Sequence, residues 1–249
     1  MNISVALAAY NGELYIEEQI RSILNSIGAD DELVISLNES TDNTEEIVRD
    51  LVAEDNRINL VHCRKKGIIT NFNYAIRHTG KEIIILSDQD DIWLPEKAEV
   101  TRNHFEETDD ILLLHNCDFV DKDLKKTGRD LYSYRNVKQG FNHNLLKNGY
   151  QGCCMAFKRE LIRYICPIPP HVAMHDQWIG LIAEKVGKVG IIDDKLILYR
   201  DYSESNSSEG VGVKRKISNV IGMKTMVSKR LANVEKRRKL MSGKQTADR

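Results

Sequence analysis

One stretch decides the fold: residues 83–91 read IIILSDQDD, an apolar run that leads directly into three carboxylates. A short, continuous apolar run is typical of a strand that is covered on both faces, as the strands of parallel sheets are. Ligands of such sheets bind at the carboxyl ends of the strands. The stretch therefore predicts a buried strand over 83–86 with a polar binding site at its end.

Three units of the same kind precede this strand, and each is an apolar strand followed by a loop and an amphipathic helix. The expected strands are 3–9, 33–37 and 58–61. Repeated units of this kind predict an α/β fold with a Rossmann-like, mostly parallel sheet flanked by helices. Polar residues follow three of the strands and should converge on one sheet edge: Tyr10-Asn11, Asn38-Glu39 and Asp88-Gln89-Asp90-Asp91.

The regular alternation ends after Pro95, and the polar stretch 121–143 has no assignment. We expect a main domain over 1–210, with halves 1–95 and 96–210, and a tail over 211–249. In the second half the patterns predict a helix at 96–107, a strand at 111–114, an apolar segment at 153–157, the start of a helix at 174–180, and a strand pair at 189–192 and 196–199.

Charge and composition exclude several classes of protein. The 36 basic and 37 acidic residues nearly cancel, so overall charge gives no reason to expect a nucleic-acid binder. The five cysteines show no metal-binding or disulfide spacing, which indicates reduced, mostly buried thiols. The N-terminus has no basic segment before its apolar run, and no window approaches the roughly 20 apolar residues of a spanning helix. We expect a cytoplasmic protein whose membrane contact, if any, is peripheral.

The segment 213–240 is predicted to form a basic amphipathic helix. It has ten Lys or Arg residues against one Glu, with apolar residues interspersed. Three interpretations stay open: attraction to an anionic membrane on the inner face of the cell membrane, a contact in a homo-oligomer, and a solvated helix. We favour the membrane, because each basic residue near anionic lipid contributes about 1 kcal/mol.

The acidic run at 88–91 suits a hard divalent cation. Carboxylates held close together are unfavourable unless a cation or solvent compensates their charge. Mg²⁺ or Mn²⁺ takes one or two carboxylates and completes its shell with phosphate oxygens and water. A solvated acidic turn is the alternative, and an Asp-x-Asp pattern by itself does not exclude it.

With these motifs in place, the chain resembles glycosyltransferase family 2, the inverting enzymes of the GT-A fold, over roughly residues 3–206. Within that family it is most similar to bacterial polysaccharide enzymes of the rhamnosyltransferase-like group. The motifs that carry the resemblance are Ala9-Tyr10-Asn11-Gly12, Ser40-Thr41-Asp42-Asn43-Thr44, Asn71-Phe72-Asn73-Tyr74-Ala75 and Leu86-Ser87-Asp88-Gln89-Asp90-Asp91-Ile92-Trp93.

The resemblance implies roles for individual residues. It makes Asp88 and Asp90 the pair that meets Mg²⁺ or Mn²⁺ and the donor diphosphate, with 1–95 as the nucleotide-sugar-binding half and 96–210 as the acceptor-binding half. It makes Asp176 the general base, although Asp176 also suits a helix cap before 177–186. The donor-binding residues it implies are Ala9, Tyr10, Asn11, Asn38, Lys65, Gly67, Asn71, Asp88, Gln89 and Arg200.

Two positions depart from the family pattern. Asn38 stands where the family commonly has a carboxylate that recognises the base, so recognition of the base is altered. Tyr199-Arg200-Asp201-Tyr202 stands where the family has Tyr-Arg-Gln-His, and either Asp201 or Tyr202 is a candidate replacement for the histidine. His175, Trp93 and Trp178 lie near the predicted site in sequence, with core packing as the alternative for the tryptophans.

The implied function is transfer of a hexose or deoxyhexose from a nucleoside-diphosphate sugar to a glycan or lipid-linked acceptor in bacterial surface polysaccharide synthesis. The first alternative is a catalytically inactive protein that keeps the fold and binds nucleotide sugars or acts as a scaffold. The second alternative is a nucleotidyltransferase. The N-terminal loop argues against it, because this loop is not a Gly-rich phosphate-binding loop that carries Lys or Arg.

Overall fold

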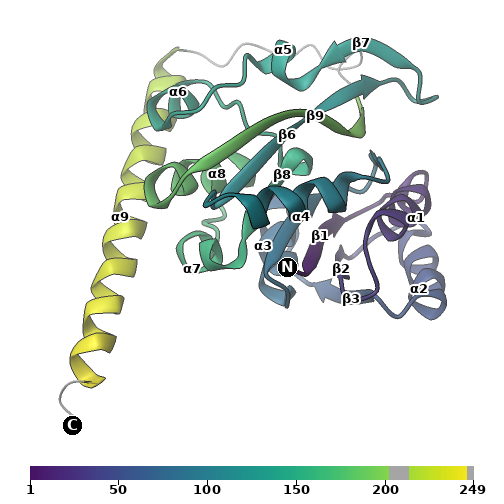
Figure 1. Ribbon diagram of the computed structural model, residues 1–249, viewed down its shortest axis with the longest axis horizontal. Helices are drawn as coiled ribbons and strands as arrows, with labels where there is room; N and C mark the ends of the chain where they lie inside the picture. Colours follow the sequence, from purple (N-terminus) through teal and green to yellow (C-terminus); the bar gives the residue numbers. More distant parts are fainter. Residues whose placement is uncertain (202–212, 246–249) are drawn as a thin grey trace.

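Nine strands form one mixed sheet in the computed structural model, which describes residues 1–201 and 213–245 (Figure 1). Along the sheet the order is β3-β2-β1-β4-β8-β6-β9-β5, and β7 pairs with β6. Helices pack against the sheet, and the buried side chains of the strands form the core with them. The predicted α/β class is therefore confirmed.

The first four strands are parallel, as their apolar composition predicts. Neighbouring strands are in register from Ser4 opposite Glu32 to Ala9 opposite Leu37, and from Ile3 opposite Ile83 to Leu7 opposite Ser87. This half consists of β1 (Ile3–Ala9), α1 (Ile16–Ser26), β2 (Glu32–Asn38), α2 (Thr44–Glu54), β3 (Ile58–Cys63), α3 (Ile68–His78) and β4 (Ile83–Ser87).

The second half of the chain adds antiparallel pairs to the sheet. β8 (Met155–Lys158) lies antiparallel between β4 and β6 (Leu112–Val120), and β9 (Val189–Arg200) lies parallel to β6. The predicted strand pair at 189–199 is wrong, because both segments belong to the single strand β9. The exposed polar residues Asp193, Asp194 and Lys195 interrupt the apolar pattern within β9, which is why the segment looked divided in the sequence.

The remaining elements surround this half of the sheet. The unassigned polar stretch contains β7, α5 and the start of α6. The elements are β5 (Ile92–Trp93), α4 (Lys97–Glu107), β7 (Lys126–Asp130), α5 (Leu131–Arg135), α6 (Phe141–Leu146), η1 (Gly152–Cys154), η2 (Arg159–Leu161), α7 (Ile162–Ile165) and α8 (His175–Val186).

The basic tail is a long helix, α9 (Val213–Gln245), which runs along one side of the molecule and extends beyond it at the C-terminal end (Figure 1). It packs against α6, α7 and α8, with Met223 and Val227 buried. Every described side chain from Glu235 to Leu240 is exposed. Within the described ranges, no helix combines the length and the apolar character that crossing a membrane requires.

Candidate active site

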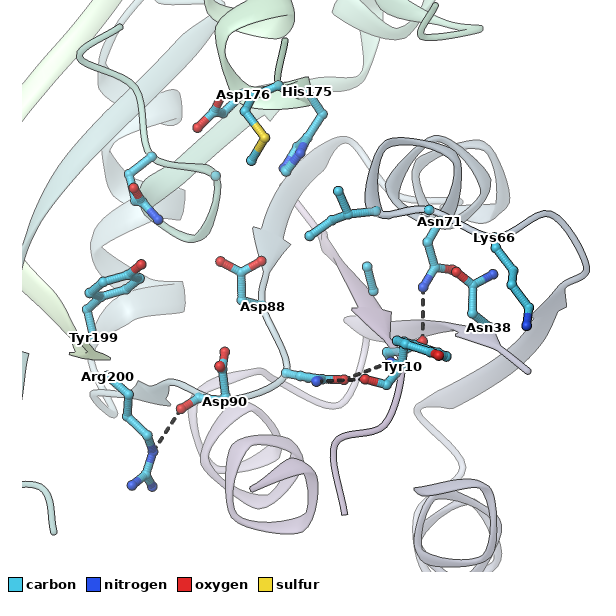
Figure 2. A pocket seen from close by; sticks show the side chains of 18 residues that line it. Tyr10, Asn38, Lys66, Asn71, Asp88, Asp90, His175, Asp176, Tyr199 and Arg200 are labelled. Atoms are coloured by element: carbon cyan, nitrogen blue, oxygen red, sulfur yellow. Dashed lines mark hydrogen bonds between the residues drawn. The ribbon is translucent and has the colours of Figure 1, made fainter. Parts of the chain in front are cut away.

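Three adjacent parallel strands end at one edge of the sheet and bring the predicted polar residues together. Tyr10 follows β1, Asn38 ends β2, and Asp88 follows β4. These residues line a pocket of about 550 Å³ (Figure 2). The second half of the chain completes the pocket wall with Gln151, Gly152, Met174, His175, Asp176, Tyr199 and Arg200.

Gln89 joins the loop after β4 to the loop after β1. Its Oε1 accepts from the backbone N of Tyr10 at 2.8 Å, and its Nε2 donates to the backbone O of Tyr10 at 3.0 Å. Gly12 permits this close approach, because a Cβ there would lie 2.6 Å from Gln89 Oε1. The two loops therefore form one connected rim of the pocket.

Asp88 and Asp90 lie in the middle of the pocket (Figure 2), and with the buried Asp91 they form what we call the acidic cluster. Oxygen and sulfur atoms of Asp88, Asp91 and Cys153 lie within 4.8 Å of one another. Burial and the neighbouring charge of Asp90 raise the pKa of Asp88 to about 7. Asp91 is 1% exposed, and its Oδ2 has no hydrogen-bond partner among the described residues. A buried carboxylate oxygen without a partner favours a bound cation, so the carboxylates of Asp88 and Asp91 fit a hard divalent metal, whereas the buried thiol of Cys153, whose pKa is raised by burial, is not a ligand of that kind.

Arg200 holds the acidic loop from the end of β9. Its Nε donates to the backbone O of Asp90 at 2.8 Å, and its backbone N donates to Asp91 Oδ1 at 3.3 Å. The other guanidinium nitrogens donate to Glu18 and to the backbone O of Lys122. Most of the donors of Arg200 are thus used within the protein, and its observed contacts position the acidic loop.

Asn38 presents an acceptor to the pocket. Its Nδ2 donates to the backbone O of Cys63 at 2.6 Å and of Lys65 at 3.0 Å, which fixes the orientation of the amide. No hydrogen bond to Asn38 Oδ1 occurs within the described part of the chain. Asn71 braces the same wall, since its Nδ2 donates to the backbone O of Ala9 at 3.0 Å.

Asp176 and His175 approach the pocket from the start of α8, opposite Tyr10 and Asn38 (Figure 2). Asp176 is 4% exposed, and burial raises the pKa of its carboxyl to about 6. Its Oδ1 accepts from Asn148 Nδ2 at 3.2 Å and from the backbone N of Gln177. The N-cap position belongs to Met174, so the capping alternative for Asp176 is wrong: Asp176 lies in the first turn of the helix.

His175 is a buried histidine with free ring nitrogens. The ring stacks on Phe72 with 4.0 Å between centroids, and neither nitrogen has a hydrogen-bond partner in the described ranges. Burial lowers its pKa to about 4, so the ring is neutral at pH 7. A Cβ on Gly152 would lie 2.8 Å from His175 Nε2, and glycine at that position therefore makes room for the ring.

Eight of the ten residues expected to bind the donor line the pocket, and Asn11 and Lys65 do not. Asn11 Oδ1 accepts from the backbone N of Thr41 at 2.9 Å, so its side chain shapes the neighbouring loop. Lys65 lines a different groove, while Lys66 lines this pocket. Asp90, expected at the metal, also lines it.

Other residues named from the sequence lie elsewhere. Asp201 forms an ion pair with Arg129, and Tyr202 lies outside the described residues. Trp93 and Trp178 are buried and do not line the pocket. Trp178 Nε1 donates to the backbone O of Ile165 at 3.0 Å, which is a packing role.

Sequence reasoning missed Lys97 and Cys153. Lys97 is fully buried, donates to the backbone O of Cys153 at 2.8 Å, and lies 4.0 Å from the ring centroid of Trp93. Burial lowers its pKa to about 8. A signal existed, because Lys97 shares the buried face of its helix with Ala98, Thr101 and Phe105. Cys153 offered no such signal, since it reaches the cluster only through the pairing of β8 with β4.

The chain matches the sequence model of Glycosyl transferase family 2 over residues 4–166, more than half of its length. An uncharacterized glycosyltransferase of Nostoc sp. is 25% identical over 214 residues, which cover 83% of this chain and 66% of that protein. The dTDP-rhamnosyl transferase RfbG of Shigella flexneri is 27% identical, covering 84% and 76%. The Escherichia coli protein WfaP, a UDP-Glc:alpha-D-GlcNAc-diphosphoundecaprenol beta-1,3-glucosyltransferase, is 29% identical, covering 51% and 49%.

Solved structures share the fold. Staphylococcus aureus TarS 1–349 in complex with UDP-GlcNAc superposes with a TM-score of 0.68 at 18% identity, covering 94% of this chain and 67% of that one. The mannosyltransferase PcManGT of Pyrobaculum calidifontis, in complex with GDP-Man and Mn²⁺, gives a TM-score of 0.61 at 20% identity, covering 79% and 56%. Against some of these proteins the chain spans only about two thirds of their length or less.

Proposed function

The chain belongs to glycosyltransferase family 2 and has the GT-A fold, and from this premise we propose that it is an inverting hexosyl- or deoxyhexosyltransferase. It moves the sugar from a nucleoside diphosphate to a glycan or lipid-linked acceptor in bacterial surface polysaccharide synthesis. The observation that carries the proposal is one pocket with two opposed sides. Tyr10 and Asn38 lie on one side, the acidic cluster lies in the middle, and the buried carboxylate of Asp176 lies on the other.

The Tyr10 and Asn38 side binds the nucleoside. The Oδ1 acceptor of Asn38, which accepts no hydrogen bond from the described residues, suits a base with a ring N–H, such as N3–H of uracil or thymine. It opposes cytosine, whose N3 is itself an acceptor. RfbG is named for a dTDP sugar and WfaP for UDP-Glc, and TarS was crystallised with UDP-GlcNAc. We therefore assign a UDP- or dTDP-sugar as the donor.

Asp88, Asp90 and Asp91 of the acidic cluster would hold Mg²⁺ or Mn²⁺. A bound divalent cation supplies positive charge that stabilises the leaving diphosphate. The protein contributes the carboxylates, the partnerless Oδ2 of Asp91 and the bonds from Arg200 that fix the loop. PcManGT was crystallised with Mn²⁺, which supports the same class of ion here.

Asp176 acts as the general base. Inversion needs one carboxylate to take a proton from the acceptor hydroxyl as that oxygen attacks the anomeric carbon from the face opposite the diphosphate. A pKa of about 6 leaves Asp176 ionised at pH 7 and still basic enough to accept the proton. Asn148 and the backbone N of Gln177 hold its Oδ1 in place.

We assign residues 1–95 to donor binding, 96–210 to acceptor binding, and the tail 211–249 to peripheral contact with an anionic membrane. The exposed basic side chains near the end of α9 support the last assignment. WfaP is named for an acceptor linked to diphosphoundecaprenol, and an enzyme at the membrane surface is well placed for such acceptors.

A donor-panel titration tests the proposal. UDP-, dTDP-, GDP- and CDP-sugars are titrated into the protein by calorimetry, with Mn²⁺, with Mg²⁺ and with EDTA, and release of nucleoside diphosphate is followed in parallel. We expect binding of a UDP- or dTDP-sugar that weakens without metal. Absence of binding across the whole panel would refute the proposal, and metal-dependent binding without any turnover in the presence of acceptor extracts would favour the inactive scaffold.

A further inference from the structure

A second hollow of about 920 Å³ lies outside the donor pocket, between the loop after β3, the outer face of α3 and the segment 167–170. We call it the basic groove. Four residues with basic side chains line it: His62, Arg64, Lys65 and Arg77. No acidic residue lines it among the described residues, although acidic and basic residues are nearly equal in the whole chain. The positive charge of the groove is therefore a local accumulation.

These cations are free to meet a ligand. No ion pair of Arg64, Lys65 or Arg77 is present within the described part of the chain, and all three residues are exposed. Asn73 adds a donor at the groove, because its Oδ1 accepts from the backbone N of Ile168 at 2.8 Å and leaves the amide Nδ2 available. Arginine, lysine and amide donors together are the groups that bind phosphate oxygens.

Two parts of the chain border both the groove and the donor pocket: helix α3 and the segment 167–176. Helix α3 presents Ile68 and Asn71 to the pocket and Thr70, Asn73, Tyr74 and Arg77 to the groove. One helix therefore separates them, a thickness of about 10 Å. The chain that leaves the groove at Pro170 enters the pocket lining at Met174 and reaches Asp176 six residues after Pro170, which is at most about 20 Å of extended chain.

We propose that the basic groove binds the phosphate or diphosphate group of the acceptor while the acceptor hydroxyl reaches Asp176. This inference rests on the proposed function and specifies the acceptor class: a sugar or glycan that carries a diphosphate ester. Most of the groove belongs to the donor-binding half, but Pro167, Ile168 and Pro170 belong to the segment that continues to Asp176. A ligand anchored in the groove therefore lies beside the segment that carries the proposed general base. The divalent cation that the acidic cluster would hold is the charge partner of the donor diphosphate, which therefore does not need the groove.

The test compares two variants that lose the same number of charges. The groove variant carries Arg64→Gln, Lys65→Gln and Arg77→Gln. The control variant carries Arg49→Gln, Lys125→Gln and Lys188→Gln, three exposed cations that line neither the groove nor the donor pocket. Isopentenyl diphosphate, a soluble diphosphate ester, is titrated by calorimetry with saturating UDP and Mn²⁺ in the cell, so that the donor pocket is occupied. Binding to vesicles of phosphatidylcholine with phosphatidylglycerol is measured separately.

We expect the groove variant to bind isopentenyl diphosphate at least roughly tenfold more weakly than the wild type, and the control variant to stay within about twofold. Absence of binding by the wild type, or equal weakening in both variants, overturns the inference. Loss of vesicle binding by the groove variant with unchanged binding of the ester also overturns it, since the groove would then serve the lipid surface. UDP titrations of both variants keep this result separate from the proposed function, because donor binding succeeds or fails independently of the groove.

Discussion

The burial of Asp176 determines the pH range in which its carboxyl can act as a general base. Its carboxyl has a pKa of about 6 because burial disfavours the charged form, and a general base works only when it is ionised. The transfer rate should therefore be constant above about pH 7. Below pH 6 it should fall as the pH is lowered, with a slope that approaches tenfold per pH unit. A pH–rate profile with saturating donor measures this. A profile with no inflection near pH 6 would contradict the assignment.

The substitution Asp176→Asn tests the same carboxyl directly. The amide keeps the volume of the side chain but cannot take a proton, so we expect the transfer rate to fall by roughly 10²–10⁴-fold. Donor affinity should change little, because Asp176 lies across the pocket from Tyr10 and Asn38. A large loss of donor affinity with an unchanged maximal rate would instead make Asp176 a binding residue.

Asn38 tests how a departure from the family pattern is accommodated. In Asn38→Asp, a carboxylate oxygen would replace Nδ2, which now lies 2.6 Å and 3.0 Å from two backbone carbonyl oxygens. We expect this change toward the family residue to weaken UDP binding by roughly tenfold or more. The new carboxylate oxygen is an acceptor, and it would face the backbone oxygens of Cys63 and Lys65, which are acceptors too. Asn38→Ala should remove the preference for UDP over CDP. Calorimetry measures both, and tighter UDP binding by Asn38→Asp would contradict the observed orientation of the amide.

The helices and strands show what the sequence could and could not predict. The four parallel strands and the acidic run at the end of the fourth were predictable, because continuous apolar runs and the residues that follow them are local signals. Cys153 was not assigned to the site because its position depends on the antiparallel pairing of β8 with β4, whereas Lys97 was missed although its helix pattern places it on a buried face. The strand β9 was misread as two strands because the polar residues Asp193, Asp194 and Lys195 interrupt its apolar pattern.

Two helix glycines give a matched test of helix packing. A Cβ on Gly180 in α8 would lie 2.2 Å from Cε2 of Tyr150, whose hydroxyl donates to Glu184 at 2.9 Å. We expect Gly180→Ala to lower the free energy of unfolding by about 1–3 kcal/mol through overpacking. Gly222→Ala in α9 is the control, since a Cβ there meets nothing within 4 Å, and it should be neutral or stabilising by up to about 1 kcal/mol. Denaturant unfolding measures both, and an equal effect of the two substitutions would contradict this packing.

For the whole molecule, the sequence indicated a basic helix but could not say which part of it is free. The structure divides α9: Met223 and Val227 are buried against the body, whereas every described side chain from Glu235 to Leu240 is exposed. Arg230 belongs to the attached part, since its guanidinium donates to the backbone O of Tyr164 and of Pro167. We therefore assign the membrane contact proposed above to the exposed residues 235–240 of the helix.

The tail variant Lys236→Gln, Arg237→Gln, Arg238→Gln tests this division. At about 1 kcal/mol for each basic residue near anionic lipid, the three substitutions should weaken binding to vesicles that contain phosphatidylglycerol by roughly 100-fold. Vesicle sedimentation measures the effect, which should shrink as salt is added because these charges are exposed to solvent. The control variant removes the same number of charges from other surfaces and should keep nearly full binding. Equal losses in the two variants would mean that only the overall charge matters, and the tail would then have no specific part in membrane contact.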